Sequence, residues 1–182
     1  RQPFAEQRVT IVRSKSAVPF PADFQLVGAM NPCPCGYWGM AASPCPCSDD
    51  RVKRYLGRVQ DTIEKFDLRV ELPSSGWETV QGQRKAESSA AVRERVTVAR
   101  EIQRQRLGAS TAARMNARQI HEYCALEPNT EKHLEAAVKR HGWSRQRVQC
   151  VLKVARTVAD LANRVQIYSS DLAEAVCYQE RS

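Results

Sequence analysis

Four of the seven cysteines lie in one short loop, with a spacing that suits a metal ion. They form two identical Cys-Pro-Cys units, at residues 33–35 and 45–47. Each proline favours an extended backbone at the residue before it, and in an extended chain residues i and i+2 point to the same side. Two such units facing each other would offer Zn²⁺ a tetrahedral set of thiolates, and the alternative is four reduced cysteines in a loop. The candidate ligands are Cys33, Cys35, Cys45 and Cys47.

A second candidate for chemistry is Asn31, which directly follows the continuous apolar run Phe24–Met30. A run of this length without polar residues is typical of a strand buried on both faces of a parallel sheet. A neutral amide at the tip of such a strand can hold a water molecule by donating and accepting hydrogen bonds. The alternative is a simple turn residue before Pro32.

The elements around these residues predict a small α/β part over about 1–75. Val9–Val12 and Val18–Phe20 are rich in β-branched residues and predict a hairpin. Asp49–Gly57 is predicted to be a helix, and the alternating run Leu68–Leu72 is predicted to be a second strand. The sequence from Pro73 onward is typical of a linker, which we place at 76–85.

Residues 86–182 change in composition and predict an α-helical bundle. Breaks are expected at Gly108, Pro128, Gly142 and Asn163. The predicted helices are Glu87–Leu107, Asn116–Tyr123, Thr130–His141, Ser144–Leu161 and Ser170–Tyr178. The predicted fold class is therefore α+β, a small α/β part followed by a helical bundle.

Cysteine usage and hydropathy bear on location. Cys124, Cys150 and Cys177 stand alone in helical patterns and are expected to be small buried side chains. An odd number of cysteines without a charged-then-apolar leader argues against a disulfide framework. No apolar run approaches the roughly 18 residues of a membrane span. The sequence predicts a cytoplasmic protein that does not enter a membrane.

Two motifs lie far apart in the chain, AMNPCPCGYWG at 29–39 and KVARTVADL at 153–161. With them, and from RQP at its start, the whole chain resembles the magnesium-chelatase-like AAA+ ATPases, in the branch of the competence protein ComM. The resemblance implies the last strands of an AAA+ core over 1–75 and its helical lid over 86–182. In that family RQP lies downstream of the P-loop, and the sequence contains no G-x-x-x-x-G-K-[ST]. We therefore expect a C-terminal portion that does not hydrolyse ATP alone.

The resemblance also implies roles for residues of the core. Asn31 corresponds to sensor 1, which positions the water that attacks the γ-phosphate. Family members carry an arginine finger in a segment like LLDRIDL, and here Lys65 occupies that position. Arg54 and Arg58, one helical turn apart, are alternative sources of the charge, and a solvated basic face is the plainer interpretation of all three.

In the lid, the family's sensor 2 arginine aligns with Gln146, so a flanking arginine, Arg145 or Arg147, would have to replace it at the nucleotide. Arg156 and Asp160, four residues apart in the same predicted helix, are expected to form a structural ion pair. The full-length parent is expected to bind ATP and Mg²⁺ and to assemble with itself into a ring, expected to be a hexamer.

The net charge of +8 favours a polyanionic partner. Because ComM-like proteins are associated with DNA branch migration and natural transformation, the expected partner is DNA. The candidate surface is the arginine-rich stretch containing Arg93, Arg95, Arg100, Arg104 and Arg106. The alternative function is a non-catalytic module, in which a zinc loop and basic helices bind nucleic acid or a protein without any nucleotide.

Overall fold

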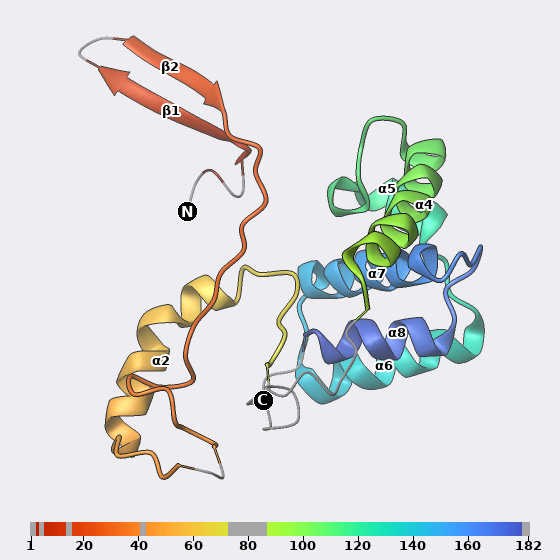
Figure 1. Cartoon of the computed structure of the whole chain (residues 1–182). Coiled ribbons are helices and arrows are strands. Elements are labelled where there is room, and N and C mark those ends of the chain that lie inside the picture. The colour runs from red at the N-terminus through yellow and green to blue at the C-terminus, as the bar shows by residue number, and fades with distance from the viewer. Residues whose placement is uncertain (1–2, 4–5, 14–15, 41–42, 73–86, 180–182) are drawn as a thin grey trace. The chain divides into compact units, whose positions relative to one another are not determined.

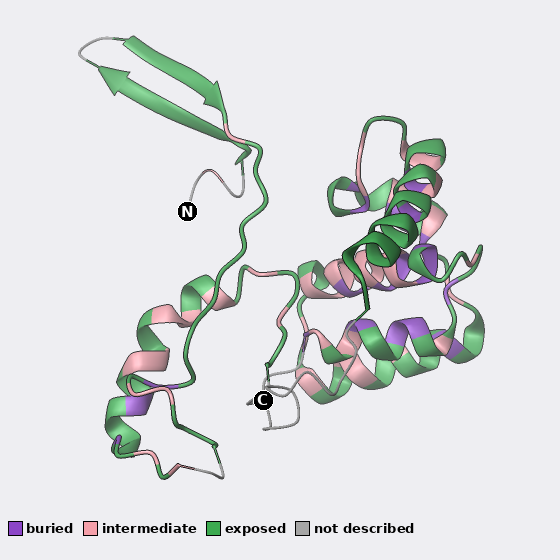
Figure 2. Cartoon of the chain, in the orientation of Figure 1, coloured by how far each residue is buried: buried purple, intermediate pink, exposed green. Residues whose placement is uncertain are grey.

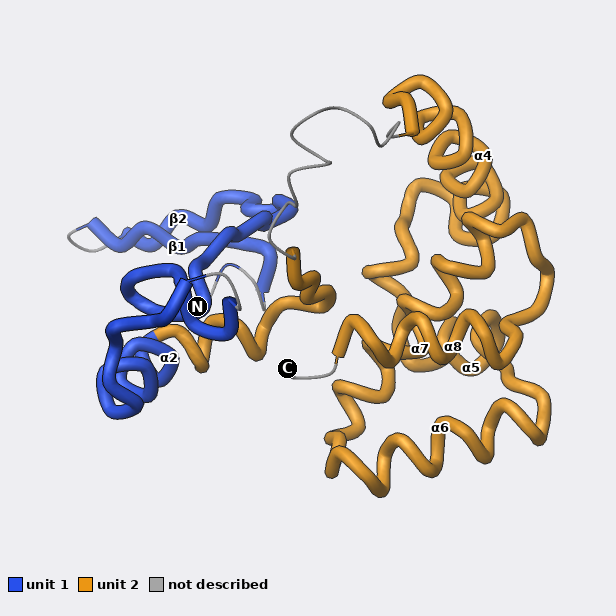
Figure 3. Tube along the Cα trace, turned by 60° about the horizontal axis from the view of Figure 1, so that its bottom comes forward, with its two compact units in different colours: residues 1–58 blue, residues 59–182 orange. Residues whose placement is uncertain are grey.

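The computed structural model describes residues 3, 6–13, 16–40, 43–72 and 87–179. The linker predicted at 76–85 therefore lies outside the described residues. The chain divides into two compact units, Arg1–Arg58 and Val59–Ser182 (Figure 3). A small sheet and a helical bundle make up an α+β fold, as predicted. The finer boundaries at 1–75 and 86–182 stay a prediction.

The predicted hairpin is confirmed in the first unit. Strands β1 (Arg8–Arg13) and β2 (Ser16–Pro21) pair antiparallel, with Val9 opposite Phe20. Alternation along the strands places the apolar side chains of Val9 and Phe20 on the same face as Ile11 and Val18. Every described residue of the two strands is exposed, as Figure 2 shows.

The buried strand predicted at Phe24–Met30 is wrong. Residues 22–31 have no regular secondary structure, and Phe24 and Val27 are 51% and 82% exposed. A parallel strand exists only through ladder hydrogen bonds to its neighbours. Within the described ranges, β1 and β2 pair with each other and with no other strand. The apolar run therefore has the composition of a strand but no partner.

The predicted helix after the cysteine loop is confirmed and is longer than expected, because α2 runs from Asp49 to Ile63. The carbonyl oxygen of Ser48 accepts hydrogen bonds from the amides of Arg51 and Val52. Asp49 and Asp50 lie in the first turn, where negative charge is favourable at a helix N-terminus.

The second unit contains the helices predicted for the bundle. Each begins or ends within a few residues of its predicted boundary. The elements are α4 (Ser89–Leu107), the 3₁₀ turn η1 (Ala112–Arg114), α5 (Ala117–Tyr123), α6 (Pro128–His141), α7 (Arg145–Leu161) and α8 (Ser169–Cys177).

Side-chain caps explain several of these boundaries. The side chains of Ser88, Asn116 and Ser144 accept a backbone N–H in the first turn of α4, α5 and α7, respectively. Gly142 ends α6 at φ +63°, a left-handed conformation that costs glycine little. Asn163, predicted as a break, follows α7 with φ +54°.

Helix α7 is the centre of the bundle and packs against α4, η1, α5 and α8. Figure 1 shows α8 lying between α7 and α6. Val151, Ala155 and Ala159 give α7 a fully buried stripe of small side chains, which allows its neighbours to approach closely. Cys124 is buried as predicted, Cys150 is half-buried, and the prediction for Cys177 is wrong because it is exposed. No helix in the described residues is both long and apolar enough to cross a membrane.

The strand predicted at Leu68–Leu72 is also wrong. Val70 and Leu72 are 67% and 87% exposed, and the segment has no ladder partner among the described strands. It is instead attached to the end of α8, since the amide of Arg69 donates to the carbonyl of Tyr178 at 3.1 Å.

Candidate functional site

The structure brings the four cysteines of the two Cys-Pro-Cys units together. Their sulfur atoms all lie within 4.8 Å of one another. Cys33 Sγ is 3.3 Å from Cys35 Sγ and 3.6 Å from Cys45 Sγ, and the last two are 3.4 Å apart. The predicted convergence of the two units is therefore confirmed.

These distances suit a tetrahedral metal ion. Four thiolates at about 2.3 Å from Zn²⁺ lie about 3.8 Å from one another, by tetrahedral geometry. The three separations among Cys33, Cys35 and Cys45 are within about half an ångström of this value, and all four sulfur atoms lie within 4.8 Å of one another. The donor set is all sulfur, which favours zinc over hard cations such as Mg²⁺ or Ca²⁺.

The cysteine loop folds because the cluster is also the hydrophobic core of its unit. Cys33, Cys47 and Val52 are buried together, with Leu56 packed against them one turn further along α2. Gly36 makes the turn inside the first half of the loop, with φ +86° and its amide donating to the carbonyl of Cys33.

Protonation in the cluster is uneven. Burial raises the pKa of Cys33, but hydrogen bonds from Cys35, the Trp38 backbone and Cys45 outweigh it and lower that pKa to about 6. Burial raises the pKa of Cys45 to about 12 and also raises the pKa of Cys47. A bound cation would favour the ionised form of all four thiols, as in a thiolate metal site.

Asn31 is held next to this cluster. Its carbonyl oxygen accepts a hydrogen bond of 3.1 Å from the hydroxyl of Tyr55 on α2. Its side chain lies close to Gly36: a Cβ atom added to this glycine would be 3.7 Å from the side-chain nitrogen Nδ2 of Asn31. The residue is exposed, so its amide is open to solvent while its backbone is tied to α2.

The basic residues at and after α2 are exposed. Arg54 donates to the carbonyl of Asp50 at 3.3 Å, a contact within the helix. Arg58 lies one turn further, and Lys65 lies just beyond the end of α2 at Ile63. All three residues are exposed, and Arg54 and Arg58 are neighbours on α2.

The three candidate lid residues differ in exposure and in their contacts. Arg145 and Gln146 are exposed in the first turn of α7. Arg147 is half-buried and donates to the carbonyl of Glu64 at 2.6 Å and to Gln179 Oε1 at 2.6 Å. The contact between Arg147 and the segment that carries Lys65 has no signal in the sequence, because it joins residues far apart in the chain.

The pair formed by Arg156 and Asp160 is structural, as predicted. Both side chains are almost fully buried and lie 3.0 Å apart. Arg106 was missed as the second partner: its guanidinium donates to both oxygens of Asp160, at 2.8 and 3.0 Å. Its assignment to a DNA-binding face is a correction, since its side chain is only 16% exposed.

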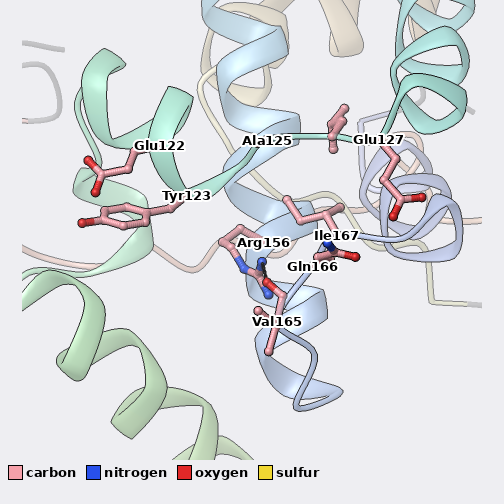
Figure 4. A pocket seen from close by; sticks show the side chains of 9 residues that line it. Glu122, Tyr123, Ala125, Glu127, Arg156, Val165, Gln166 and Ile167 are labelled. Carbon is pink, nitrogen blue, oxygen red and sulfur yellow. Dashed lines mark hydrogen bonds between the residues drawn. The ribbon is translucent and has the colours of Figure 1, made fainter.

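Arg156 is also one of the residues that line a small pocket of about 270 Å³ in the bundle (Figure 4). Its guanidinium nitrogens already donate to Asp160 and to the carbonyls of Val165 and Arg164. Glu122 and Glu127 are the other charged residues lining the pocket. A polyanion would therefore meet two carboxylates and an arginine that is already neutralised.

Most of the arginines predicted to contact DNA from α4 form ion pairs with acidic side chains. Arg95 contacts Glu87 at 2.7 Å, and Arg104 contacts Glu101 at 2.6 Å. Arg93 and Arg100 are exposed and form no ion pair with any residue that the structure describes. These two residues are the members of the predicted series that remain candidates for contacts to DNA.

Comparison with known proteins gives a consistent family. Residues 1–80 match the family described as magnesium chelatase, subunit ChlI, and residues 86–179 match magnesium chelatase, subunit ChlI C-terminal. Competence protein ComM of Haemophilus influenzae is 38% identical over 98% of this chain, and YifB of Salmonella typhimurium is 35% identical over 98%. The chain spans 35% of the length of each of these relatives. The chain belongs to the magnesium chelatase ChlI family and is similar to its ComM and YifB members.

Proposed function

We propose that this chain supplies the sensor 1, finger and lid regions of an AAA+ ATPase that works as a ring, a hexamer, on DNA. The observation that carries the proposal is the family match, which runs in order through both halves of the chain. The chain has no P-loop sequence, so ATP and Mg²⁺ would be held mainly by residues beyond it.

In this proposal Asn31 positions the water molecule that attacks the γ-phosphate. An amide can hold that water without adding charge, and the exposure of Asn31 leaves its amide available. Lys65 supplies positive charge to the transferring phosphate, with Arg54 and Arg58 as alternatives. Lysine keeps the charge of the family's arginine but not its bidentate fork, so a slow ATPase is expected.

At the lid, Arg145 and Gln146 are the proposed contacts to nucleotide phosphates. They lie in the first turn of α7, where the helix dipole favours an anion. Arg147 is turned toward its own unit, where it contacts Glu64 and Gln179.

The cysteine cluster is proposed to hold a structural zinc ion that fixes the position of Asn31. Asn31 precedes the first ligand, Cys33, by two residues, and its carbonyl is bonded to Tyr55 on the helix that packs against the cluster. Zinc would therefore tie the Asn31 loop to α2, because the same residues form the core of the unit. The ion has no role in the chemical step in this proposal.

DNA is the proposed partner of the ring, in line with the name of the competence protein among its relatives. The net charge of +8 supports a polyanionic partner. Arg93 and Arg100 of α4 are exposed and form no ion pair among the described residues, so they are the candidates in this chain for contacts to the DNA backbone.

The decisive experiment measures ATP hydrolysis by the full-length protein, with and without DNA, for the natural sequence and Asn31→Ala. We expect DNA-stimulated hydrolysis, with kcat at least about tenfold lower in Asn31→Ala. Arg140→Gln, an exposed change on α6, is the control and is expected to hydrolyse ATP normally. Absence of ATPase activity in the folded full-length protein would refute the proposal.

A second candidate function is favoured by one observation, the convergence of four cysteine sulfurs in a loop outside the bundle. In this case the chain is a zinc-stabilised module that binds nucleic acid or a protein without nucleotide. Zinc-dependent DNA binding, together with no ATPase activity in the full-length protein, would select this function over the motor.

A further inference from the structure

We infer that Arg147 is a positioning residue that fixes the backbone on both sides of Lys65 and so attaches the finger position to the helical unit. The inference rests on the proposed function for the role of Lys65. It differs from the role that the family alignment suggests for this part of α7, where an arginine would contact the nucleotide.

The geometry is a fork that holds two carbonyl oxygens. Nη2 of Arg147 donates to the carbonyl of Glu64 at 2.6 Å, and Nη1 donates to the carbonyl of Phe66 at 3.4 Å. These are the residues immediately before and after Lys65. A guanidinium can make both contacts because its donors lie in one plane, whereas a lysine ammonium lacks this fork.

A second layer of contacts fixes the arginine itself. Nη1 of Arg147 donates to Gln179 Oε1 at 2.6 Å, and Gln179 Nε2 donates in turn to the carbonyl of Asp67. Gln179 is buried at 3% exposure, just after α8. The side chain of Gln179 therefore links Arg147 to the backbone of Asp67, the residue that follows Phe66.

Two further contacts extend the attachment along the segment. Cys150 lies one turn after Arg147 on α7, and its Sγ is 3.2 Å from Asp67 Oδ1. The amide of Arg69 donates to the carbonyl of Tyr178 at 3.1 Å. The segment from Glu64 to Arg69 is thus bonded to the start of α7 and to the end of α8.

The side chain of Lys65 stays outside this network and is exposed. Its backbone is held while its ammonium group is free to approach a phosphate, which is the arrangement a charge-supplying residue needs. Because the holding contacts come from α7 and α8, any movement of the helical unit would carry Lys65 with it.

The kinetic test is a double-mutant cycle on ATP hydrolysis by the full-length protein, using Lys65→Gln, Arg147→Gln and the double variant. We expect each single change to lower kcat by at least about fivefold with KM for ATP unchanged, and the double variant to match Lys65→Gln within about twofold. Arg140→Gln on α6 is the matched loss of one exposed charge, and Arg147→Lys is expected to restore little because it lacks the fork.

The outcomes separate the inference from the proposed function. If Lys65→Gln lowers kcat and Arg147→Gln does not, or if the two effects multiply, Arg147 does not act through Lys65 and the inference is wrong. A raised KM for ATP in Arg147→Gln would mean that the arginine contacts nucleotide. If Lys65→Gln has no effect, the proposed role of Lys65 fails first.

Hydrogen exchange gives a readout that needs no activity. The amides of Lys65 and Phe66 donate to carbonyls at the end of α2, and that of Arg69 donates to Tyr178. In the full-length protein, Arg147→Gln should speed their exchange by at least about tenfold relative to Arg140→Gln, while the amides of α5 stay unchanged. Equal exchange in the two variants would overturn the positioning contact itself.

Discussion

The carboxylate of Asp160 accepts two hydrogen bonds from the guanidinium of Arg106, at 2.8 and 3.0 Å, although the two residues are 54 apart in the sequence. Arg156 donates to the same carboxylate from within α7. Burial, together with the positive charge of Arg106, lowers the pKa of Arg156, and hydrogen bonding to Asp160 raises the pKa of Arg106. Asp160 therefore joins α4 to α7 as a shared anion between two arginines.

Asp160→Asn should destabilise the helical unit strongly. Removing the anion leaves two guanidinium groups with uncompensated charge in a site where the Asp160 side chain is fully buried. Loss of one partner of a buried ion pair typically costs about 3–5 kcal/mol of unfolding free energy. Chemical denaturation of the natural chain and the variant measures the difference.

The control for that change is Glu101→Gln, which removes the exposed pair with Arg104 on α4. Exposed pairs contribute about 0–1 kcal/mol, so this variant should unfold almost like the natural chain. Equal destabilisation by the two variants would mean that the buried cluster has no special weight.

Zinc binding is predicted at about one ion per chain, since four thiolates complete a tetrahedral site. Protein produced with added zinc should lose it on Cys33→Ser or Cys45→Ser, measured as metal content. Cys177→Ser, which changes an exposed cysteine of the other unit, should keep the full amount. Metal-free protein from zinc-supplemented cells would contradict the site.

Stability should fall when the pH rises above 9. Burial raises the pKa of Cys124 from 9.0 to about 11, and burial together with Asp67 raises the pKa of Cys150 from 9.0 to about 12. Above pH 9 the two thiols release their protons in the unfolded chain but keep them in the folded protein. Their contribution to the free energy of unfolding is therefore fully present below pH 9 and is lost as the pH rises toward 12.

Thermal unfolding at pH 8 and at pH 10.5 measures this effect. Cys124→Ala and Cys150→Ala should each lose less stability between the two pH values than the natural chain does. Cys177→Ala is the exposed control and should follow the natural chain. Identical pH dependence in all four proteins would show that these thiols do not contribute.

DNA binding should depend steeply on salt, because contacts to phosphates release counterions. Arg93→Gln and Arg100→Gln should each weaken binding, since these side chains are exposed and have no ion-pair partner among the described residues. Arg95→Gln, whose arginine is already paired with Glu87, should have a smaller effect. Fluorescence anisotropy at low and at moderate salt measures the affinity for DNA. An affinity that is the same at both salt concentrations would argue against a phosphate-contacting surface.

The helices and the cysteine cluster could be predicted because their signals are local. The apolar period of α7, its cap at Ser144 and the glycine after α6 are all written within a few residues of sequence. The two Cys-Pro-Cys units likewise constrain their own geometry. Local signals of this kind do not depend on the rest of the fold.

The contacts that the sequence did not reveal are long-range. Arg106 could be placed on a helix but not assigned to Asp160, because helix packing decides which of several arginines faces the buried carboxylate. The fork of Arg147 joins α7 to a segment without regular structure, and no periodicity marks its carbonyl partners. The predictions of strands at Phe24–Met30 and Leu68–Leu72 were wrong because an apolar run forms a strand only when neighbouring strands supply ladder hydrogen bonds.

Hydrogen exchange should reveal the missing ladder. Residues 22–31 have no partner strand in the described structure, whereas the amides of α7 lie in the centre of the bundle. Amides of α7 should therefore exchange with solvent at least about a thousandfold more slowly than those of residues 22–31. The exposed Phe24 and Val27 also make this run a site where another chain could pair, which would slow its exchange. Exchange should be measured on protein proven monomeric by sedimentation. Strong protection of residues 22–31 in that monomer would mean that the apolar run finds a partner strand within the chain.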